Sequence, residues 1–108
     1  MMTISKANNY FTLINVFTVD PKNQLRLVEL LILATKESVS TIPGFISSSL
    51  HRSLDGTKVT MYAQWESADA YQSMRANSSV SPYLDQALTI AKFEPGAYEV
   101  VETFLPLK

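Results

Sequence analysis

The first regular pattern in the chain is an alternation of side chains between residues 10 and 19. Tyr10 to Val19 is rich in aromatic and β-branched residues, which predicts a strand. Alternate residues point to opposite faces. One face would carry Phe11, Leu13, Asn15, Phe17 and Val19, and the other Tyr10, Thr12, Ile14, Val16 and Thr18. Both faces are largely apolar, so we expect this strand to be covered on both sides.

A helix is predicted directly after this strand, from Pro21 to about Ser40. Asp20 is a good N-cap, and proline is favoured in the first helical turn. The apolar stripe would contain Val28, Leu31, Ile32, Val39 and Ile42, widened by Leu27, Leu30 and Leu33. This stripe is wider than contact with one sheet requires. Pro43-Gly44 ends the segment.

Two further strands are predicted at Phe45–Leu54 and Lys58–Glu66. Asp55-Gly56 between them is a strong signal for a tight hairpin. In the second of these strands, one face would carry Val59, Met61, Ala63 and Trp65, and the other Thr60, Tyr62, Gln64 and Glu66.

The remaining chain predicts two helical pieces. Ser67 can cap a short helix over Ala68–Ala76, and Asn77–Ser79 forms a polar break. Ser81-Pro82 looks like a second cap, which would start a helix that runs to about Ala91.

A last strand is predicted over Phe93–Leu105. Pro95-Gly96 should interrupt it as a bulge or an edge position, which leaves Tyr98–Phe104 as its regular part.

The order of these elements predicts an α+β fold of the ferredoxin-like, split βαβ type, as a single domain over 1–108 with a core at about 10–105. The sheet would be antiparallel, with helices on one face only. Because the first strand is apolar on both faces, we expect the other face to meet a second copy in a two-fold dimeric α+β barrel. The alternative is a monomer with one face in water.

Composition narrows the classes of function. The 108 residues are 46% hydrophobic and 18% charged, with a net charge of -1. The nine basic residues are scattered, so we expect no nucleic acid partner. Without cysteine there is no disulfide framework, thiolate zinc site or cysteine nucleophile, and we predict no metal site. The apolar stretch Leu27–Ala34 is too short to span a membrane, and Met1–Asn9 does not read as a secretory signal. We therefore expect a soluble, cytoplasmic protein without a membrane partner.

Five segments in order carry a family resemblance. They are Ile14–Asp20, Pro43-Gly44-Phe45, Leu50–Gly56, Tyr62–Ser67, and Phe93-Glu94-Pro95 with Tyr98–Val101. Together they resemble the antibiotic biosynthesis monooxygenase family, whose members are typically homodimers with this fold. The resemblance implies oxygenation of a small aromatic molecule, a phenol or quinol, by molecular oxygen without metal, flavin or heme. No cofactor is therefore expected.

The resemblance also suggests site residues. Trp65 and Tyr71 match the aromatic pocket positions of polyketide-oxidising members. Met61 stands where an asparagine is common, and Asp85 falls near an arginine found in some members. Asn15 resembles an asparagine on the first strand of heme-degrading relatives. Those relatives place an axial histidine on the helical segment after the third strand, where this chain has none, so heme degradation is not expected.

Each candidate also has a purely structural explanation. Asn15 either lines a pocket or is satisfied by a neighbour, because a buried amide without a hydrogen bond is costly. Trp65 is either core or a stacking surface, and the Tyr71 hydroxyl reaches either substrate or solvent. His51, the only histidine, is either a base for a phenol or part of a solvated strand face that it shares with serines.

Two hypotheses follow from the sequence. The first is a cofactor-independent monooxygenase whose pocket contains Asn15, Met61, Trp65 and Tyr71, with Asn15 orienting an oxygen and His51 as the base. The second is a non-catalytic barrel of the same fold that binds a small ligand or responds to stress. Met61 and Asp85 favour the second hypothesis, because both depart from the family pattern.

Overall fold

The computed structural model describes residues 2–37, 39–76 and 82–107, and its centre is one antiparallel sheet. The strands lie in the order β2-β3-β1-β4, and a short β5 also pairs with β1. They are β1 (Phe11–Val19), β2 (Phe45–Arg52), β3 (Lys58–Trp65), β4 (Ala91–Glu94) and β5 (Ala97–Tyr98). The helices are α1 (Gln24–Glu37), α2 (Ala68–Ala76) and α3 (Pro82–Ile90), with 3-10 turns η1 (Lys6–Asn8), η2 (Pro21–Asn23) and η3 (Val39–Thr41). This arrangement confirms the predicted α+β, ferredoxin-like class.

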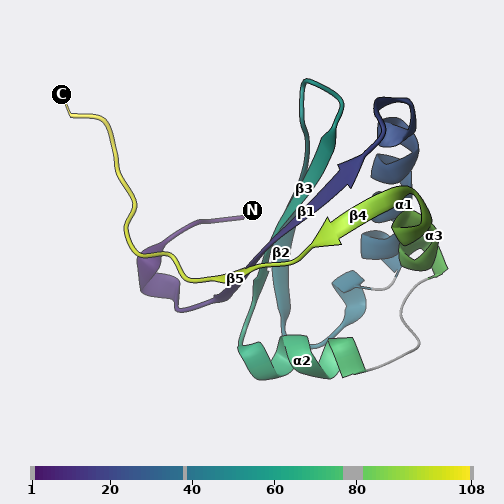
Figure 1. Ribbon diagram of the computed structural model, residues 1–108. Helices are drawn as coiled ribbons and strands as arrows, with labels where there is room; N and C mark the ends of the chain where they lie inside the picture. Colours follow the sequence, from purple (N-terminus) through teal and green to yellow (C-terminus); the bar gives the residue numbers. More distant parts are fainter. Residues whose placement is uncertain (1, 38, 77–81, 108) are drawn as a thin grey trace.

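The helices cover one face of the sheet, as the sequence predicted. Figure 1 shows α1 and α3 side by side on one side of the sheet, with α2 near its end. The N-terminal segment and the C-terminal tail extend away from the helices. No helix among the described residues is long and apolar enough to cross a membrane.

The central strand β1 sets the two faces of the sheet. Its ladder with β3 runs from Phe11 opposite Trp65 to Thr18 opposite Lys58. Odd-numbered residues from Phe11 to Val19 lie toward the helices, because Leu13, Phe17 and Val19 join the helix-covered core. We call this the helix face, and we call the opposite side, with Ile14 and Val16, the open face.

The helix face carries two separate groups of buried apolar residues. The α1–α3 cluster contains Phe17, Val19, Leu27, Leu30, Leu31, Val59 and Ala87. The α2 cluster contains Leu13, Ala63, Trp65 and Tyr71. Both clusters contain residues of β1 and β3, so these two strands connect them.

The predicted helix over Pro21–Ser40 is shorter and divided. It begins with the 3-10 turn η2, whose Lys22 backbone N–H donates to the Asp20 carboxylate at 3.1 Å, so the predicted cap is confirmed. The α-helix ends at Glu37, and η3 follows after one undescribed residue. Ile32 is 39% exposed, so its place in the predicted buried stripe was wrong. The predicted positions 27, 30 and 31 are buried, and residues 24 and 34 are buried with them.

The predicted last strand, Phe93–Leu105, was wrong in its second half. The Pro95-Gly96 interruption is confirmed, because β4 ends at Glu94 and β5 contains only two residues. No strand is assigned over 99–107. The reason is geometric: Tyr98 pairs with Thr12, one residue from the start of β1, so the chain beyond it has no neighbouring strand within the subunit.

The predictions for the helical segments after β3 have two outcomes. The α2 bounds agree with the prediction, and the Ala70 N–H donates to the predicted Ser67 cap at 3.1 Å. The predicted break at Asn77–Ser79 and the cap at Ser81 lie outside the described residues.

Candidate functional site

Asn15 and Met61 lie on the helix face where the two apolar clusters meet. They are direct partners in the β1–β3 ladder. Residues 13 and 63 on one side belong to the α2 cluster, and residues 17 and 59 on the other belong to the α1–α3 cluster. Asn15 is therefore an amide at the boundary between two apolar groups.

The Asn15 carboxamide oxygen is buried without compensation. Oδ1 is closed to solvent and has no hydrogen-bond partner among the described residues. Leaving a buried acceptor unpaired costs on the order of 1–3 kcal/mol. Of the two explanations for Asn15, satisfaction by a neighbour therefore receives no support from the described residues.

Trp65 and Tyr71 lie together in the α2 cluster. Their ring centroids are 5.8 Å apart, with the planes at 63°. Trp65 also meets Phe45 edge-on at 5.4 Å, and Tyr71 lies 5.7 Å from Phe11. Trp65 is only 1% exposed, so its ring is part of the core of the subunit.

The structure thus places Asn15, Met61, Trp65 and Tyr71 on the same side of the sheet. Trp65 and Met61 are four residues apart on β3, which corresponds to roughly 13 Å along a strand. Ala63 lies between them and fills little space. The aromatic pair and the Asn15–Met61 pair therefore form neighbouring parts of one surface, with the small side chain of Ala63 between them.

His51 lies on the other side of the sheet. Its strand neighbour Leu50 packs against the α1–α3 cluster, so His51 points to the open face. Its Nε2 is 2.8 Å from the Ser49 hydroxyl, and the residue is exposed. The structure does not bring His51 together with the other four candidates.

Asp85 is exposed on α3. Among the described residues, no group of three or more histidine, cysteine or carboxylate side chains could hold a metal ion. The largest shift in pKa is that of Asp55, in the turn between β2 and β3. Hydrogen bonds from Thr57 and Ser53 lower the pKa of Asp55 to about 2.

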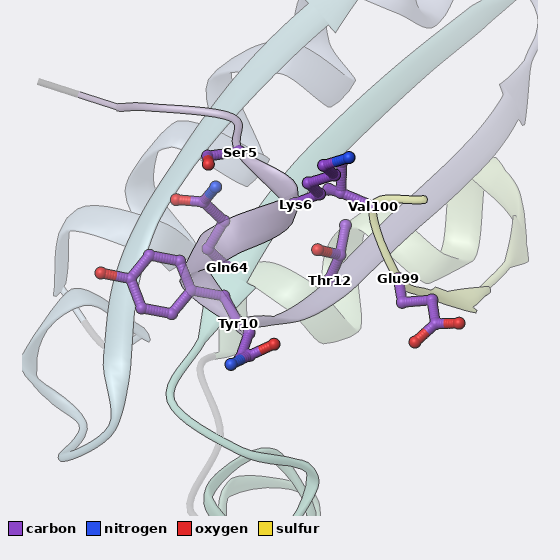
Figure 2. Close-up of a pocket in the computed structure, with 8 residues that line it drawn as sticks. Ser5, Lys6, Tyr10, Thr12, Gln64, Glu99 and Val100 are labelled. Atoms are coloured by element: carbon purple, nitrogen blue, oxygen red, sulfur yellow. The ribbon is translucent and has the colours of Figure 1, made fainter. Parts of the chain in front are cut away.

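Hollows border the described part of the molecule. One, of about 460 Å³, runs between α2 and the loop before β2, lined by Ile42, Pro43, Gly44, Glu66, Ala70, Ser73 and Met74. Another is a polar crevice of about 180 Å³ beside the N-terminal segment. Figure 2 shows Tyr10, which precedes β1, Thr12 of β1, Gln64 of β3, and Glu99 and Val100 of the C-terminal tail around this crevice. It contains none of the predicted site residues.

Sequence reasoning missed Gln64 and Tyr62 as buried polar groups of the open face. Gln64 is 2% exposed; its amide accepts from Ser47 Oγ and donates to the Thr3 carbonyl, each at 2.7 Å. The Tyr62 hydroxyl is buried without a partner among the described residues. The alternation of β3 placed both side chains on this face, but only the fold shows that the N-terminal segment covers Gln64.

Comparison with known proteins identifies the family. The sequence profile for antibiotic biosynthesis monooxygenases matches residues 10–83. The chain belongs to this family. It is also similar to tetracenomycin-F1 monooxygenase of Streptomyces glaucescens, with 36% identity over 104 residues that cover 96% of this chain and 93% of the relative.

Solved structures extend the family comparison. A monooxygenase from the ActVA-Orf6 gene of Streptomyces coelicolor, in complex with nanaomycin D, has a TM-score of 0.79 and 30% identity, covering 94% of this chain and 96% of that one. SnoaB, a cofactor-independent oxygenase from Streptomyces nogalater, has a TM-score of 0.76 over 88% of this chain and 96% of its own. At 21% identity, SnoaB supports the fold alone.

Proposed function

We propose that this chain is a cofactor-independent monooxygenase that oxidises a small phenol or quinol with molecular oxygen. The observation that carries the proposal is the buried, unpartnered Oδ1 of Asn15 beside Met61. Two relatives, at 36% and 30% identity, are both named as monooxygenases, which supports oxygenation as the reaction class.

The proposed oxygenation requires the protein to hold and orient an electron-rich ring. A deprotonated ring passes an electron to oxygen, and a carbon–oxygen bond then forms between the two radicals. When the oxidised carbon begins as a CH₂ group, loss of water leaves a carbonyl: one oxygen atom stays on the product and the other leaves as water. The substrate supplies all four electrons, so no external reductant is required.

In this proposal, the Asn15 carboxamide contacts the ring oxygen. Its Oδ1 can accept from a substrate hydroxyl, and its NH₂ group can donate to an oxygen that carries developing negative charge. Because this position is closed to water, a hydrogen bond to a developing charge is stronger there than in solvent. Met61 would contact the apolar edge of the ring through its flexible thioether side chain.

His51 lies across the sheet from Asn15, so we propose no direct proton transfer between His51 and a ring held at Asn15. Replacement of His51 by glutamine tests this assignment. Oxygen uptake by His51→Gln should stay close to that of the parent protein, and a loss of about 100-fold or more would restore His51 as the base.

Oxygen consumption tests the activity directly. The purified protein, treated with a chelator and free of flavin, is mixed with a panel of anthrones and quinols while oxygen and quinone absorbance are followed. We expect one mole of oxygen consumed per mole of quinone formed from an anthrone. No uptake above the rate without protein across the panel would contradict the proposal.

We further propose that the working form is a homodimer, in which the open faces of two subunits meet. Helices cover only the other face, and Ile14 and Val16 place apolar groups on the open one. Burying such surface is the main favourable term in association. Sedimentation should give a species of twice 12.1 kDa, and a lone subunit at micromolar concentration would contradict the dimer.

A non-catalytic ligand-binding role, with or without a stress response, is the second candidate. Met61 favours it, because a thioether cannot donate a hydrogen bond to a developing oxyanion. Thermal shift with the same panel separates the two functions. Stabilisation by a ligand without oxygen uptake would favour binding, whereas stabilisation with uptake favours catalysis.

A further inference from the structure

The polar crevice of about 180 Å³ lies on the open face, between the N-terminal segment, residues 2–9, and the start of the C-terminal tail. Figure 2 shows Thr12 of β1 and Gln64 of β3 in its lining, with Glu99 of the tail to one side. Asn15 lies on the helix face of the same sheet. The crevice is therefore separate from the candidate oxygenation site.

Hydroxyl and amide groups form most of the lining of the crevice. They belong to Ser5, Asn9, Tyr10, Thr12 and Gln64. Each of these groups can both donate and accept a hydrogen bond. Pockets for drug-sized ligands are about 300–1,000 Å³ and mostly apolar, so this crevice is smaller and more polar. At about 30 Å³ for each molecule, it has room for about six waters, which is also the room of one small ring.

The Thr12 hydroxyl is buried in the crevice without a partner. Thr12 is 2% exposed and belongs to the lining. Among the described residues, no side chain or backbone group forms a hydrogen bond with this hydroxyl. In Figure 2, the side chain points from β1 into the space between Gln64 and the tail. Because an unpaired buried hydroxyl is costly, a molecule in the crevice that bonds to Thr12 would be stabilised there.

The Gln64 carboxamide lies next to Thr12 and is held in place. Its Oε1 accepts from Ser47 and its Nε2 donates to the Thr3 carbonyl, each at 2.7 Å. A carboxamide has a second N–H and a second lone pair, so Gln64 can still bond a ligand. The two existing bonds fix its orientation, and a fixed group loses little conformational freedom when a ligand binds.

The charges at the mouth of the crevice disfavour an anion. The Lys6 Nζ is 2.9 Å from Glu102 Oε2, and its hydrogen bond lowers the pKa of Glu102. Glu99 has no ion-pair partner among the described residues. One ammonium and two carboxylates leave a net negative charge. A neutral or singly positive ligand is therefore favoured.

The crevice is compatible with the proposed homodimer. Thr12 and Gln64 are closed to solvent within one subunit, and the N-terminal segment contacts Gln64 through Thr3. Ile14 and Val16, which we propose to meet the partner, lie farther along β1.

We propose that the crevice binds a small polyhydroxylated ring, which is a monosaccharide or its amino derivative. Thr12 and Gln64 bond hydroxyl groups of this ring, since hydroxyls donate and accept as the lining does. The Tyr10 ring packs against a C–H face of the sugar. Glu99 favours the amino derivative over the neutral sugar.

Nuclear magnetic resonance titration of the purified, isotope-labelled protein tests the site. D-glucose and D-glucosamine are the ligands. D-glucuronate is the control for charge, and tetrahydropyran is the control for a ring without hydroxyls. We expect saturable shifts of the Lys6, Thr12 and Gln64 amide signals, with dissociation constants on the order of millimolar. D-glucuronate and tetrahydropyran should bind more weakly, because one adds a negative charge and the other leaves the buried polar groups unpaired.

Two outcomes of this titration would overturn the proposal. One is the absence of saturation with both sugars, which would leave the crevice to solvent alone. The other is binding of tetrahydropyran as tight as that of D-glucose, because hydroxyl groups would then not be recognised.

A substitution of Thr12 tests the residue that carries the inference. Thr12→Val keeps the branched shape and removes the hydroxyl, so the dissociation constant for D-glucose should rise about tenfold. Thr18→Val is the matched control, because Thr18 lies on the same face of β1 outside the crevice. It should change the constant less than about twofold. Equal constants for the two variants would contradict the role of Thr12.

A substitution of Glu99 tests the preference for charge. Glu99→Gln should weaken D-glucosamine binding about three- to tenfold and D-glucose binding less than about twofold, because only the amino sugar carries a positive charge. Equal losses for both sugars would contradict this preference. These measurements do not use oxygen uptake, so their failure would leave the proposed oxygenation standing.

Discussion

Asn15 and Met61 face each other directly across the β1–β3 ladder, at the boundary between the two apolar clusters of the helix face. The family resemblance places an asparagine at the position of Met61. In this chain, the amide on that row of the sheet comes from β1 instead.

The first prediction concerns Asn15→Leu. Oxygen uptake should fall about 10- to 100-fold if the carboxamide contacts the ring oxygen, because a hydrogen bond to a developing charge is lost. The free energy of unfolding should stay equal or rise, because the unpaired buried oxygen is removed. Oxygen electrode traces and urea melts measure the two effects.

Gln72→Leu is the matched control for this exchange of an amide for leucine. Gln72 is exposed on α2, so its replacement should leave oxygen uptake unchanged. If Asn15→Leu lowered stability and left uptake unchanged, Asn15 would be a structural residue and the proposed site would be wrong.

The second prediction concerns Met61. Met61→Leu keeps the volume and apolar character, so uptake should remain within about threefold and stability within about 1.5 kcal/mol. Met61→Asn places a second amide opposite Asn15 and adds a donor for the ring oxygen. We expect it to raise the rate with quinols about tenfold, at a cost of about 1–3 kcal/mol in unfolding free energy.

Kinetics of both Met61 variants with one anthrone and one quinol measure this difference. If Met61→Asn and Met61→Leu gave the same rates, the second donor would not reach the reacting oxygen. The Met61 side chain would then be only a packing element.

The faces of the central strands could be predicted because alternation is a local property. Placing Asn15, Met61 and Trp65 on one side of the sheet required only the period of two in β1 and β3. In β2, the same period places His51 and Leu50 on different faces of the sheet. What alternation could not provide was the partner of each polar group. Gln64 is satisfied by Thr3, 61 residues away, and this contact depends on the path of the N-terminal segment.

The error in the last strand has a related cause. Residues 98–104 have the apolar and β-branched character of a strand, but strand structure also requires a neighbour. Within the subunit, Tyr98 pairs with Thr12 near the start of β1, so the residues after Tyr98 have no neighbouring strand to pair with. The strand propensity of these residues was recognised from the sequence. The lack of a neighbouring strand depends on the three-dimensional fold and could not be predicted from local pattern.

A third prediction concerns Gly44, which lies in the loop before β2 and packs against α2. Its φ is +91°, and an added Cβ would lie 2.5 Å from Ala70 Cβ. Gly44→Ala therefore combines backbone strain with a clash, and should lower the unfolding free energy by about 3 kcal/mol. Because Ala70 is followed by Tyr71, displacement of α2 should also reduce oxygen uptake.

Gly56→Ala is the matched control for backbone strain. Its φ is +83°, but its added Cβ would lie 3.3 Å from Pro21 Cβ, so the clash is milder. Denaturant melts should show a loss of about 1 kcal/mol and unchanged uptake. Equal losses for the two variants would mean that α2 moves aside without cost.

The last prediction concerns acid and the hairpin turn. Asp55 Oδ1 accepts from the Thr57 hydroxyl at 2.7 Å, the Thr57 N–H at 3.0 Å and the Ser53 hydroxyl at 2.8 Å. The Thr57 hydroxyl contributes most to holding the pKa of Asp55 at about 2, below its ordinary 3.8. Because the folded pKa is lowered, the carboxylate stabilises the fold fully above pH 3.8, and this contribution disappears as pH falls toward 2. The difference in stability between the parent protein and Asp55→Asn should therefore be constant near neutrality and shrink across that interval.

Thr57→Val separates the acid effect from the shape of the turn. It removes the strongest donor and keeps the backbone N–H, so the pKa of Asp55 should rise part of the way toward 3.8. Stability curves against pH should then place Thr57→Val between the parent protein and Asp55→Asn. Parallel curves for all three proteins from pH 5 to pH 2 would show that the three hydrogen bonds do not favour the charged form of Asp55.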